Sequence, residues 1–363
     1  MLTFNHTCIG YSHLASGKPC QDASYAASND QYAIAIVSDG HGGEAYSRSD
    51  VGAQMALRAA RYVIDNNPLT SWHDPYIRPA LFDELVRTWV ELVTEHDSST
   101  HDDDTDITHV FDLVPPTRSS EITMRYGCTL MLACVHPNGW FAFQIGDGRC
   151  VAIHPLAQTG DPAQLTSEPV PADARCFLNQ TTSLCDEDAA AEFRFCGGDR
   201  DSTPVAIFLG SDGIDDSWGS DEALHNFYID ILKHCASREA VETDLADALP
   251  QLSRLGSHDD MSVAAIVDKT LLGAELGHLL QYQLYQCREQ LQDQLHLRVG
   301  FDGELYAKKT ELAALSDVDE HLERDGLYLE NRLSQIDAQI RRLAVQKIGE
   351  VIERIHVFGL HAE

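Results

Sequence analysis

Four turns within the first 260 residues carry aspartate, and three of them adjoin a run that predicts a buried strand. The strand-like runs are 32–37, 205–209 and 262–267. Carboxylates on turns at the ends of core strands can converge on one point, and oxygen ligands grouped in this way suit hard divalent cations such as Mg²⁺ or Mn²⁺. The pattern predicts a two-metal hydrolase. The four turns are Gln21-Asp22, Asp39–Gly43, Ser211–Asp216 and His258–Ser262.

The turn at Asp39 has the residue types that metal-assisted phosphoester hydrolysis needs. Two metal ions about 3.5–4 Å apart can lower the pKa of a shared water and stabilise in-line attack. Asp39 could bridge such a pair, and the small residue after it lets the backbone approach closely enough for the Gly40 carbonyl to be a ligand. His41 is placed to protonate the leaving alkoxide. We therefore predict that Asp39 and His41 are catalytic.

The charge of the chain excludes some classes of partner. The 363 residues include 26 Lys and Arg against 57 Asp and Glu, for a formal net charge of −31. Nucleic acids and anionic membranes attract basic surfaces, so neither is expected as a partner. The acidic excess agrees with a protein that gathers divalent cations, although a soluble surface alone accounts for most of it.

Cysteine spacing and apolar runs indicate the compartment. None of the ten cysteines forms a Cys-x-x-Cys pair, so neither a zinc site nor a thioredoxin-like motif is expected. Residues 1–6 lack the basic start and apolar stretch of a signal peptide, and no apolar run has the length of a membrane span. We expect a reduced, soluble, cytoplasmic protein.

Hydrophobic periodicity predicts strands and helices in alternation. The apolar run 31–38 predicts a strand buried on both faces, and 128–136 with 140–145 predicts a hairpin around Pro137-Asn138-Gly139. Helices are expected over 44–65 and through the apolar stripe that includes Leu81 and Trp89. Strands with paired helices predict an α+β sandwich. Two further helices are expected over 221–234 and 238–255.

Two long segments are expected to be irregular. Residues 97–125 hold an acidic cluster at 101–106 and read as a surface loop, with cation binding as the alternative to a merely solvated loop. Residues 155–203 are rich in Pro, Asp and Thr. We expect both segments to lie outside the sheets.

The composition changes near Lys269, which divides the chain into a domain of residues 1–268 and an extension of residues 269–363. The extension has no proline, and its leucines repeat every three or four residues, as on a helix stripe. The stripe predicts a coiled coil or a helical hairpin. It suits either an appendage packed on the main domain or an arm for self-association or partner docking.

Six motifs in order resemble the metal-dependent type-2C protein serine/threonine phosphatases over residues 1 to about 268. The Pro-Cys-Gln-Asp form at 19–22 and the stretch at 179–181 look most like a bacterial branch of that family. The resemblance implies two antiparallel β-sheets sandwiched between helices, with Mn²⁺ or Mg²⁺ in a cleft at one end. The motifs are CQDA at 20–23, VSDGHGG at 37–43, GCTLMLACV at 127–135, IGDGR at 145–149, LGSDGIDD at 209–216 and HDDMSV at 258–263.

The resemblance also implies roles for single residues. It implies that Asp39 bridges two metal ions, that Gly40 binds one of them through its carbonyl, and that His41 is the general acid. Asp22 would act through bound water or as an outer ligand. The region 155–203 would be a flap beside the cleft. The other implied metal ligands are Asp212 and Asp259 for the second ion and Asp147, with Asp216 as a candidate to share it, for a third, weaker ion.

The chain departs from the family at the position of an arginine that grips the substrate phosphate. Gly17 stands there, followed by Lys18, which could supply charge without a bidentate fork. His13 is a weaker candidate for this role. At Asp260 the family often has asparagine.

Two functions from different classes remain open. The first is a protein phosphatase that acts on phosphoserine and phosphothreonine of a partner protein, paired with a protein kinase, with the extension selecting the partner. The second is a phosphatase-fold scaffold of weak or lost activity that binds a partner through its C-terminal helices. The retained aspartates favour the enzyme, and the missing arginine favours the scaffold.

Overall fold

Two five-stranded antiparallel sheets form the centre of the fold in a computed structural model. The structure describes residues 1–100, 120–161, 164–173, 175–176, 181–314 and 320–348. The first sheet has the order β1-β10-β9-β6-β7 and the second has the order β2-β3-β4-β5-β8. The strands of the first sheet are β1 (Leu2–Cys8), β10 (Met261–Val267), β9 (Ala206–Gly210), β6 (Arg149–Ile153) and β7 (Thr166–Ser167). Those of the second are β2 (Ala23–Ser28), β3 (Ala33–Ser38), β4 (Leu130–His136), β5 (Gly139–Ile145) and β8 (Arg194–Asp199).

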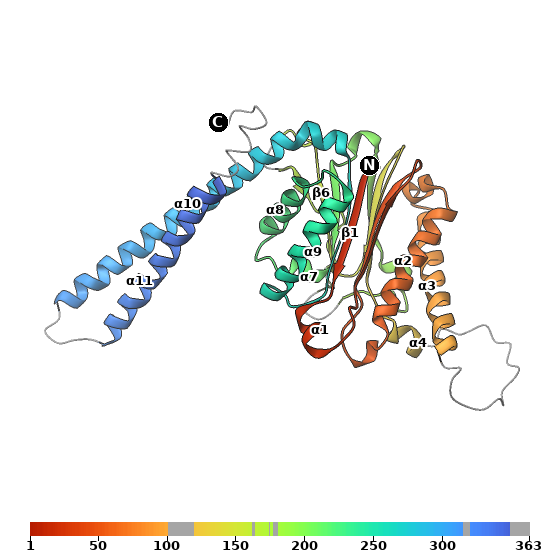
Figure 1. The fold of residues 1–363 in the computed structure, drawn as a ribbon, viewed down its shortest axis with the longest axis horizontal. Helices are drawn as coiled ribbons and strands as arrows, with labels where there is room; N and C mark the ends of the chain where they lie inside the picture. Colours follow the sequence, from red (N-terminus) through yellow and green to blue (C-terminus); the bar gives the residue numbers. More distant parts are fainter. Residues whose placement is uncertain (101–119, 162–163, 174, 177–180, 315–319, 349–363) are drawn as a thin grey trace, which may run out of the picture. The chain divides into compact units, whose positions relative to one another are not determined.

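Helices cover the outer faces of both sheets, as the sequence predicted. Figure 1 shows α2 and α3 on one side of the sheets and α8 and α9 on the other. The expected sandwich is confirmed, and so are the hairpin of β4 and β5 and the two helices after β9. The helices are α2 (Ser49–Asn66), α3 (Arg78–Thr100), α8 (Asp221–Leu232) and α9 (Arg238–Leu255).

The inner core explains why the central strands read as continuous apolar runs. Every residue of β3, β4 and β10 is buried, because one face packs against the other sheet and the opposite face packs against helices. Between the sheets, Val37 and Met131 meet Leu209 and Ile266 in one cluster. These strands are therefore fixed on both faces, and the turns at their ends are held with them.

The helical layer over the second sheet depends on a glycine. A Cβ atom on Gly52 of α2 would lie 1.9 Å from the carbonyl oxygen of Tyr126, so only glycine allows this approach. The Gly52 carbonyl accepts a hydrogen bond from the indole nitrogen of Trp89 at 3.1 Å. Trp72 stacks on Phe143 with ring centroids 5.0 Å apart. The close approach at Gly52, the hydrogen bond of Trp89 and the stacking of Trp72 together fix the helices against the second sheet.

Three expectations about element boundaries were wrong. The helix expected over 44–65 begins at Ser49, after a 3₁₀ turn at Glu44–Tyr46. The loop expected over 97–125 is partly helical, because α3 continues to Thr100 and α4 occupies Ser120–Arg125. The acidic cluster at 101–106 lies outside the described residues. The segment 155–203 contains β8, whose pairing with β5 forms the edge of the second sheet.

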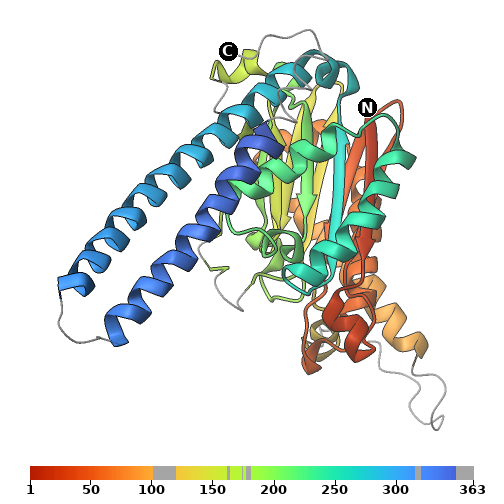
Figure 2. The same ribbon diagram turned by 60° about the vertical axis from the view of Figure 1, so that its left-hand side comes forward.

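By its internal contacts the chain divides into two compact units, residues 1–158 with 166–273, and residues 159–165 with 274–363. In the second unit α10 (Lys269–Ala314) and α11 (Glu320–Arg341) run side by side, as Figure 2 shows, and a short π-helical segment follows at Arg342–Lys347. Phe301 and Leu305 pack against Leu329 and Leu333.

Ion pairs also join the two helices of the second unit. Arg298 Nε lies 2.6 Å from Asp337, and Lys309 Nζ lies 2.7 Å from Glu330. The leucine stripe thus closes as a hairpin within one chain. Self-association stays a prediction, and residues 349–363 lie outside the described part. No helix in the described ranges is both long and apolar enough to cross a membrane.

Candidate metal centre

Strand pairing brings the first two aspartate turns together. Ala23 of β2 lies opposite Ser38 of β3. Asp22 and Asp39 are the next residues outward, so their side chains are neighbours at the end of the second sheet. The Gly40 N–H donates to the carbonyl of Gln21 at 3.1 Å, and a Cβ atom at position 40 would lie 2.6 Å from that oxygen. The glycine is therefore required by the packing of the two turns.

The other two turns meet at the corresponding end of the first sheet. Gly210 of β9 pairs with Val263 of β10. Asp212 begins the short helix α7 (Asp212–Asp215) after β9, and Asp259 stands two residues before β10. The backbone of Gly213 passes so close to this turn that a Cβ atom would lie 2.1 Å from the Asp260 carbonyl oxygen. Both carboxylates thus belong to one tightly packed corner.

Electrostatic coupling shows that the carboxylates from all four turns form one cluster. The pKa of Asp39 is raised well above its usual value by burial and then by the charges of Asp22, Asp212 and Asp259. Burial also raises the pKa of Asp212 to about 6, and the charges of Asp147 and Asp259 act in the same direction. The sequence-predicted ligands are therefore close enough to repel one another.

Asp22 supplies the observation that favours a bound cation. Its side chain is 5% exposed, and burial raises the pKa of this carboxyl well above its usual value. The hydroxyls of Ser211 and Ser262 act in the opposite direction. Within the described chain, the Asp22 Oδ2 atom is buried and has no hydrogen-bond partner. A buried oxygen without a partner, among further carboxylates, fits a divalent cation that prefers oxygen ligands.

Asp147 and Asp216 lie on the outer side of this cluster. Together with Asp212 and Arg194 they line a cavity of about 310 Å³. Burial raises the pKa of Asp216, and the charges of Asp147 and Asp259 raise it further. This geometry is compatible with the predicted third ion at Asp147. It also supports the interpretation of Asp216 as a residue at the end of α7, where it is the C-cap.

Three carboxylates surround the guanidinium of Arg149. It lies 2.5 Å from Glu168, 2.6 Å from Asp221 and 3.4 Å from Asp215. The Asp215 carboxylate is 27% exposed and pairs with Arg149. Arg149 also lines the cavity of Asp147 and Asp216, so the three carboxylates hold a guanidinium at its wall.

His41 follows Gly40 in the Asp39 turn and is held through its backbone. Its N–H donates to the Gly127 carbonyl at 3.1 Å, and its carbonyl accepts from Gln21 Nε2 at 3.1 Å and from Ser49 Oγ at 2.9 Å. Burial lowers the pKa of the imidazole to about 4, although the Asp186 charge opposes this. The ring is therefore neutral at neutral pH, and the predicted general-acid role requires that a bound phosphate raise its pKa.

The predicted phosphate-binding residue is at the protein surface. Lys18 is exposed, and its backbone N–H donates to the His13 carbonyl at 3.1 Å. Gly17 ends the short helix α1 (Tyr11–Ser16) in the left-handed conformation, with φ 71°. His13, the weaker candidate, pairs with Asp260 at 2.9 Å.

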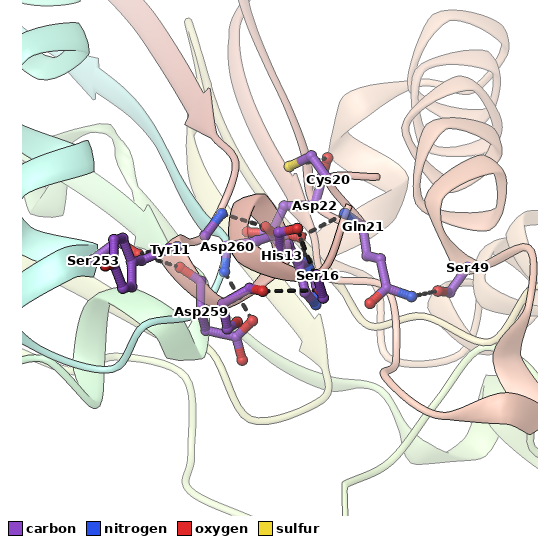
Figure 3. A network of polar contacts seen from close by, with 12 residues as sticks. Tyr11, His13, Ser16, Cys20, Gln21, Asp22, Ser49, Ser253, Asp259 and Asp260 are labelled. Carbon is purple, nitrogen blue, oxygen red and sulfur yellow. Dashed lines mark hydrogen bonds and ion pairs between the residues drawn. The ribbon is translucent and has the colours of Figure 1, made fainter. Parts of the chain in front are cut away.

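Sequence reasoning missed two residues that organise the site. Gln21 donates from its side-chain amide to Ser49 Oγ at 2.5 Å as well as to His41, so it joins two of the aspartate turns. Asp260 lies among backbone N–H groups from the N-terminal segment (Figure 3). Gln21 belongs to the motif CQDA at 20–23 and precedes the candidate ligand Asp22, and this position is the signal that could have identified it. Asp260 gave no local signal of its role.

A second group of potential ligand atoms is better explained as structural. His13, Asp259 and Asp260 present such atoms within 4.8 Å of one another. Both Asp260 oxygens, however, already accept hydrogen bonds from N–H groups, and the His13 ring donates to one of them. A cation held by Asp260 would have to displace these donors, so we assign His13 and Asp260 to the framework of the site.

Comparison with known families agrees with the geometry. A model of protein phosphatase 2C matches residues 9–250. The chain belongs to the protein phosphatase 2C family. Members of this family depend on Mn²⁺ or Mg²⁺. None of the curated proteins in the comparison matches the chain.

Several solved bacterial phosphatases are similar in structure to this protein phosphatase 2C. The serine/threonine phosphatase Stp1 from Staphylococcus aureus is 13% identical over 74% of this chain and 96% of its own, with a TM-score of 0.48. The catalytic domain of PstP, in complex with two manganese ions, is 17% identical over 73% and 98%, with a TM-score of 0.46. PppA from Pseudomonas aeruginosa is 18% identical over 72% and 95%, with a TM-score of 0.45.

Proposed function

We propose that this protein phosphatase 2C hydrolyses phosphoserine and phosphothreonine in a partner protein by means of two divalent cations. The observation that carries the proposal is the cluster of mutually repelling carboxylates around the unpartnered Asp22 oxygen. When bound, Mn²⁺ or Mg²⁺ supplies a water of lowered pKa for attack on phosphorus. The chain would supply the carboxylate ligands at the corner where the ends of the two sheets meet.

Each residue of the cluster has a distinct proposed role. Asp39, which is partly exposed and is affected by the charges of Asp22, Asp212 and Asp259, would bridge the two ions, and the Gly40 carbonyl would bind one of them. Asp212 and Asp259 would hold the second ion, and Asp22 would act from its buried position as an outer ligand. Asp147 would bind a third ion at the cavity. His41 would donate the proton to the leaving serine or threonine oxygen, once bound phosphate has raised its pKa.

Substrate binding would involve an exposed cation and the helical extension. Lys18 is exposed near the start of the motif and would meet the phosphate as a point charge. A phosphoprotein made by a protein kinase is the substrate class that a serine/threonine phosphatase consumes. The helical hairpin of α10 and α11 would select that protein or bind a second copy of the chain.

The test measures hydrolysis of a phosphothreonine peptide with Mn²⁺, with EDTA, and with Asp39→Asn and Asp212→Asn. Either substitution removes one negative charge from the cluster and is expected to reduce turnover on the order of 100-fold or more. Asp83→Asn, on the exposed side of α3, is the matched control and is expected to have wild-type activity. Substantial activity in Asp39→Asn with Mn²⁺ present would sink the assignment.

A scaffold without catalysis is the second candidate. It is favoured by one observation, the absence of an arginine at position 17, where Gly17 ends α1 in a left-handed conformation. If the folded protein binds Mn²⁺ but does not turn over the peptide, the scaffold becomes the better description. The α10–α11 hairpin is then the place to search for a partner.

A further inference from the structure

Asp260 collects three hydrogen bonds from one short stretch of chain. Its side chain is 3% exposed. Oδ1 accepts from the N–H of Gly10 at 2.6 Å, and Oδ2 accepts from the N–H of Gln21 at 2.6 Å and from Nδ1 of His13 at 2.9 Å. Figure 3 shows the carboxylate between His13 and Gln21. All three donors lie within residues 10–21, about 240–250 residues away in the sequence.

The same stretch also contacts the turn before β10 through its backbone. The N–H of Ser12 donates to the carbonyl of His258 at 2.9 Å, and the N–H of Tyr11 donates to Ser253 Oγ at 3.0 Å. Ser253 in turn donates to the carbonyl of Asp259 at 3.0 Å. At Gly10 a Cβ atom would lie 2.4 Å from the carbonyl carbon of Asp259. The two segments are therefore in direct backbone contact.

Gln21 carries this connection to the remaining turns. Its N–H is held by Asp260, its carbonyl accepts from the N–H of Gly40 at 3.1 Å, and its side chain reaches the carbonyl of His41 at 3.1 Å. Asp22 is the next residue. Gln21, the residue before Asp22, is thus connected to the Asp260 carboxylate by one hydrogen bond, and Gly40, the residue after Asp39, is connected to it through Gln21 by two.

We propose that Asp260 and His13 are positioning residues, which hold Asp22 and Asp259 at the spacing that a divalent cation needs. Both oxygens of a carboxylate accept hydrogen bonds, so all three donors are satisfied. An asparagine has only one acceptor oxygen, and its NH₂ group would face N–H donors that need an acceptor. His13 supplies one of the two donors to Oδ2 of Asp260, next to the acidic cluster. The two residues therefore act as a pair. The inference rests on the proposed function because it assumes that the cluster binds metal.

Outer partners of this kind have measurable effects on metal affinity. Removing a group that orients the residues around a metal typically weakens binding about 10- to 100-fold. His13→Ala removes one of the three donors that hold the Asp260 carboxylate, so we expect the Kd for Mn²⁺ to rise about 10-fold. His13→Asn places an amide nitrogen near the position of Nδ1, so we expect a Kd within about 3-fold of the wild type.

The experiment measures Mn²⁺ binding to the full-length protein by titration calorimetry, together with the thermal unfolding of each metal-free variant. His234→Ala is the matched control, because His234 pairs with Asp244 at 3.3 Å on the surface, where both side chains are more than half exposed. The control is expected to bind Mn²⁺ like the wild type. Asp260→Asn is the second test of the pair, and its Kd is expected to rise at least as much as that of His13→Ala.

The outcomes separate this inference from the proposed function. A Kd of His13→Ala or Asp260→Asn within 2-fold of the wild type overturns the inference. An equal loss in His13→Ala and His13→Asn overturns the hydrogen-bonding role of His13. If the wild type binds Mn²⁺ but hydrolyses no phosphopeptide, the proposed function fails and the positioning role stands. A wild type that binds neither Mn²⁺ nor Mg²⁺ overturns both.

Discussion

Asp39 and Thr129 exchange two hydrogen bonds between neighbouring chain segments. The N–H of Asp39 donates to Thr129 Oγ1 at 3.0 Å, and the N–H of Thr129 donates to the Asp39 carbonyl at 2.8 Å. Thr129 is 3% exposed, and its own carbonyl accepts from Ser38 Oγ at 2.6 Å. The backbone of Asp39 is therefore fixed by Thr129, the residue before β4, before any ligand binds.

Thr129→Val is expected to weaken both stability and Mn²⁺ binding. Valine has nearly the shape of threonine but leaves the N–H of Asp39 buried without its acceptor, which costs about 1–2 kcal/mol. We expect the free energy of unfolding to fall by that amount and the Kd for Mn²⁺ to rise several-fold. Chemical denaturation and calorimetry measure the two effects. Thr129→Ser keeps the hydroxyl, and a loss of affinity as large as that of valine would contradict the explanation.

Asp212 is expected to make the stability of the metal-free protein fall as pH rises. Its folded-state pKa of about 6 is above the ordinary aspartate value of about 3.9, so the folded chain binds its proton more tightly than the unfolded chain. The free energy of unfolding therefore decreases as pH rises from about 4 through 6. Several buried histidines have lowered pKa values and act in the opposite direction, so the effect must be measured as a difference.

The difference between the wild type and Asp212→Asn isolates this effect. Asparagine resembles the protonated carboxyl, so both proteins should be similarly stable near pH 4.5 in EDTA. Near pH 7.5 the variant should be more stable, by on the order of 1–2 kcal/mol. Saturating Mn²⁺ should reverse the order, because only the wild type retains the full carboxylate set. A difference independent of pH would show that Asp212 is not crowded by other carboxylates.

Local patterns in the sequence were sufficient to predict the central strands and the aspartates of the cluster, whereas the arrangement in two sheets came from the resemblance to a known family. Asp39 and Asp212 directly follow or nearly follow apolar runs, and such runs form central strands whose ends are fixed by the sandwich. Strand order was not needed to expect convergence, because three of the four turns adjoin a strand that is buried on both faces. Turn-forming residues and apolar runs can both be recognised from neighbouring positions in the sequence, and the structure brings the aspartates of the turns together.

Features that depend on distant residues could not be predicted. Strand β8 contains Gly197 and Gly198, which disfavour a strand, and it forms because β5 offers a free edge. The role of Asp260 depends on donors at Gly10 and Gln21, far away in the sequence. Nothing in the local sequence distinguishes this carboxylate, which is a framework residue, from its neighbour Asp259, which is a proposed ligand.

Gly17 is expected to be required by the backbone. It has φ 71°, its N–H bonds to the His13 carbonyl, and no atom lies within 4 Å of the position that a Cβ atom would take there. Gly17→Ala should therefore cost about 1 kcal/mol through the left-handed conformation alone, and Gly17→Asn should cost less. Urea unfolding measures both. Gly219→Ala, also in open space but without a positive φ, is the control, and an equal cost there would contradict the explanation.

Leu333→Asp is expected to disrupt the helical hairpin and to leave the chemistry intact. Leu333 is 9% exposed and packs with Leu305 and Leu329, so a buried charge there should cost several kcal/mol of local stability. We expect early loss of helical signal on heating and faster proteolysis in α10 and α11, with Mn²⁺-dependent hydrolysis of a small phosphate ester within 2-fold of the wild type. Leu327→Asp, at a position that is 60% exposed, is the control. If Leu333→Asp abolishes hydrolysis of the small ester while Leu327→Asp does not, the hairpin contributes to the catalytic unit and is more than a docking element.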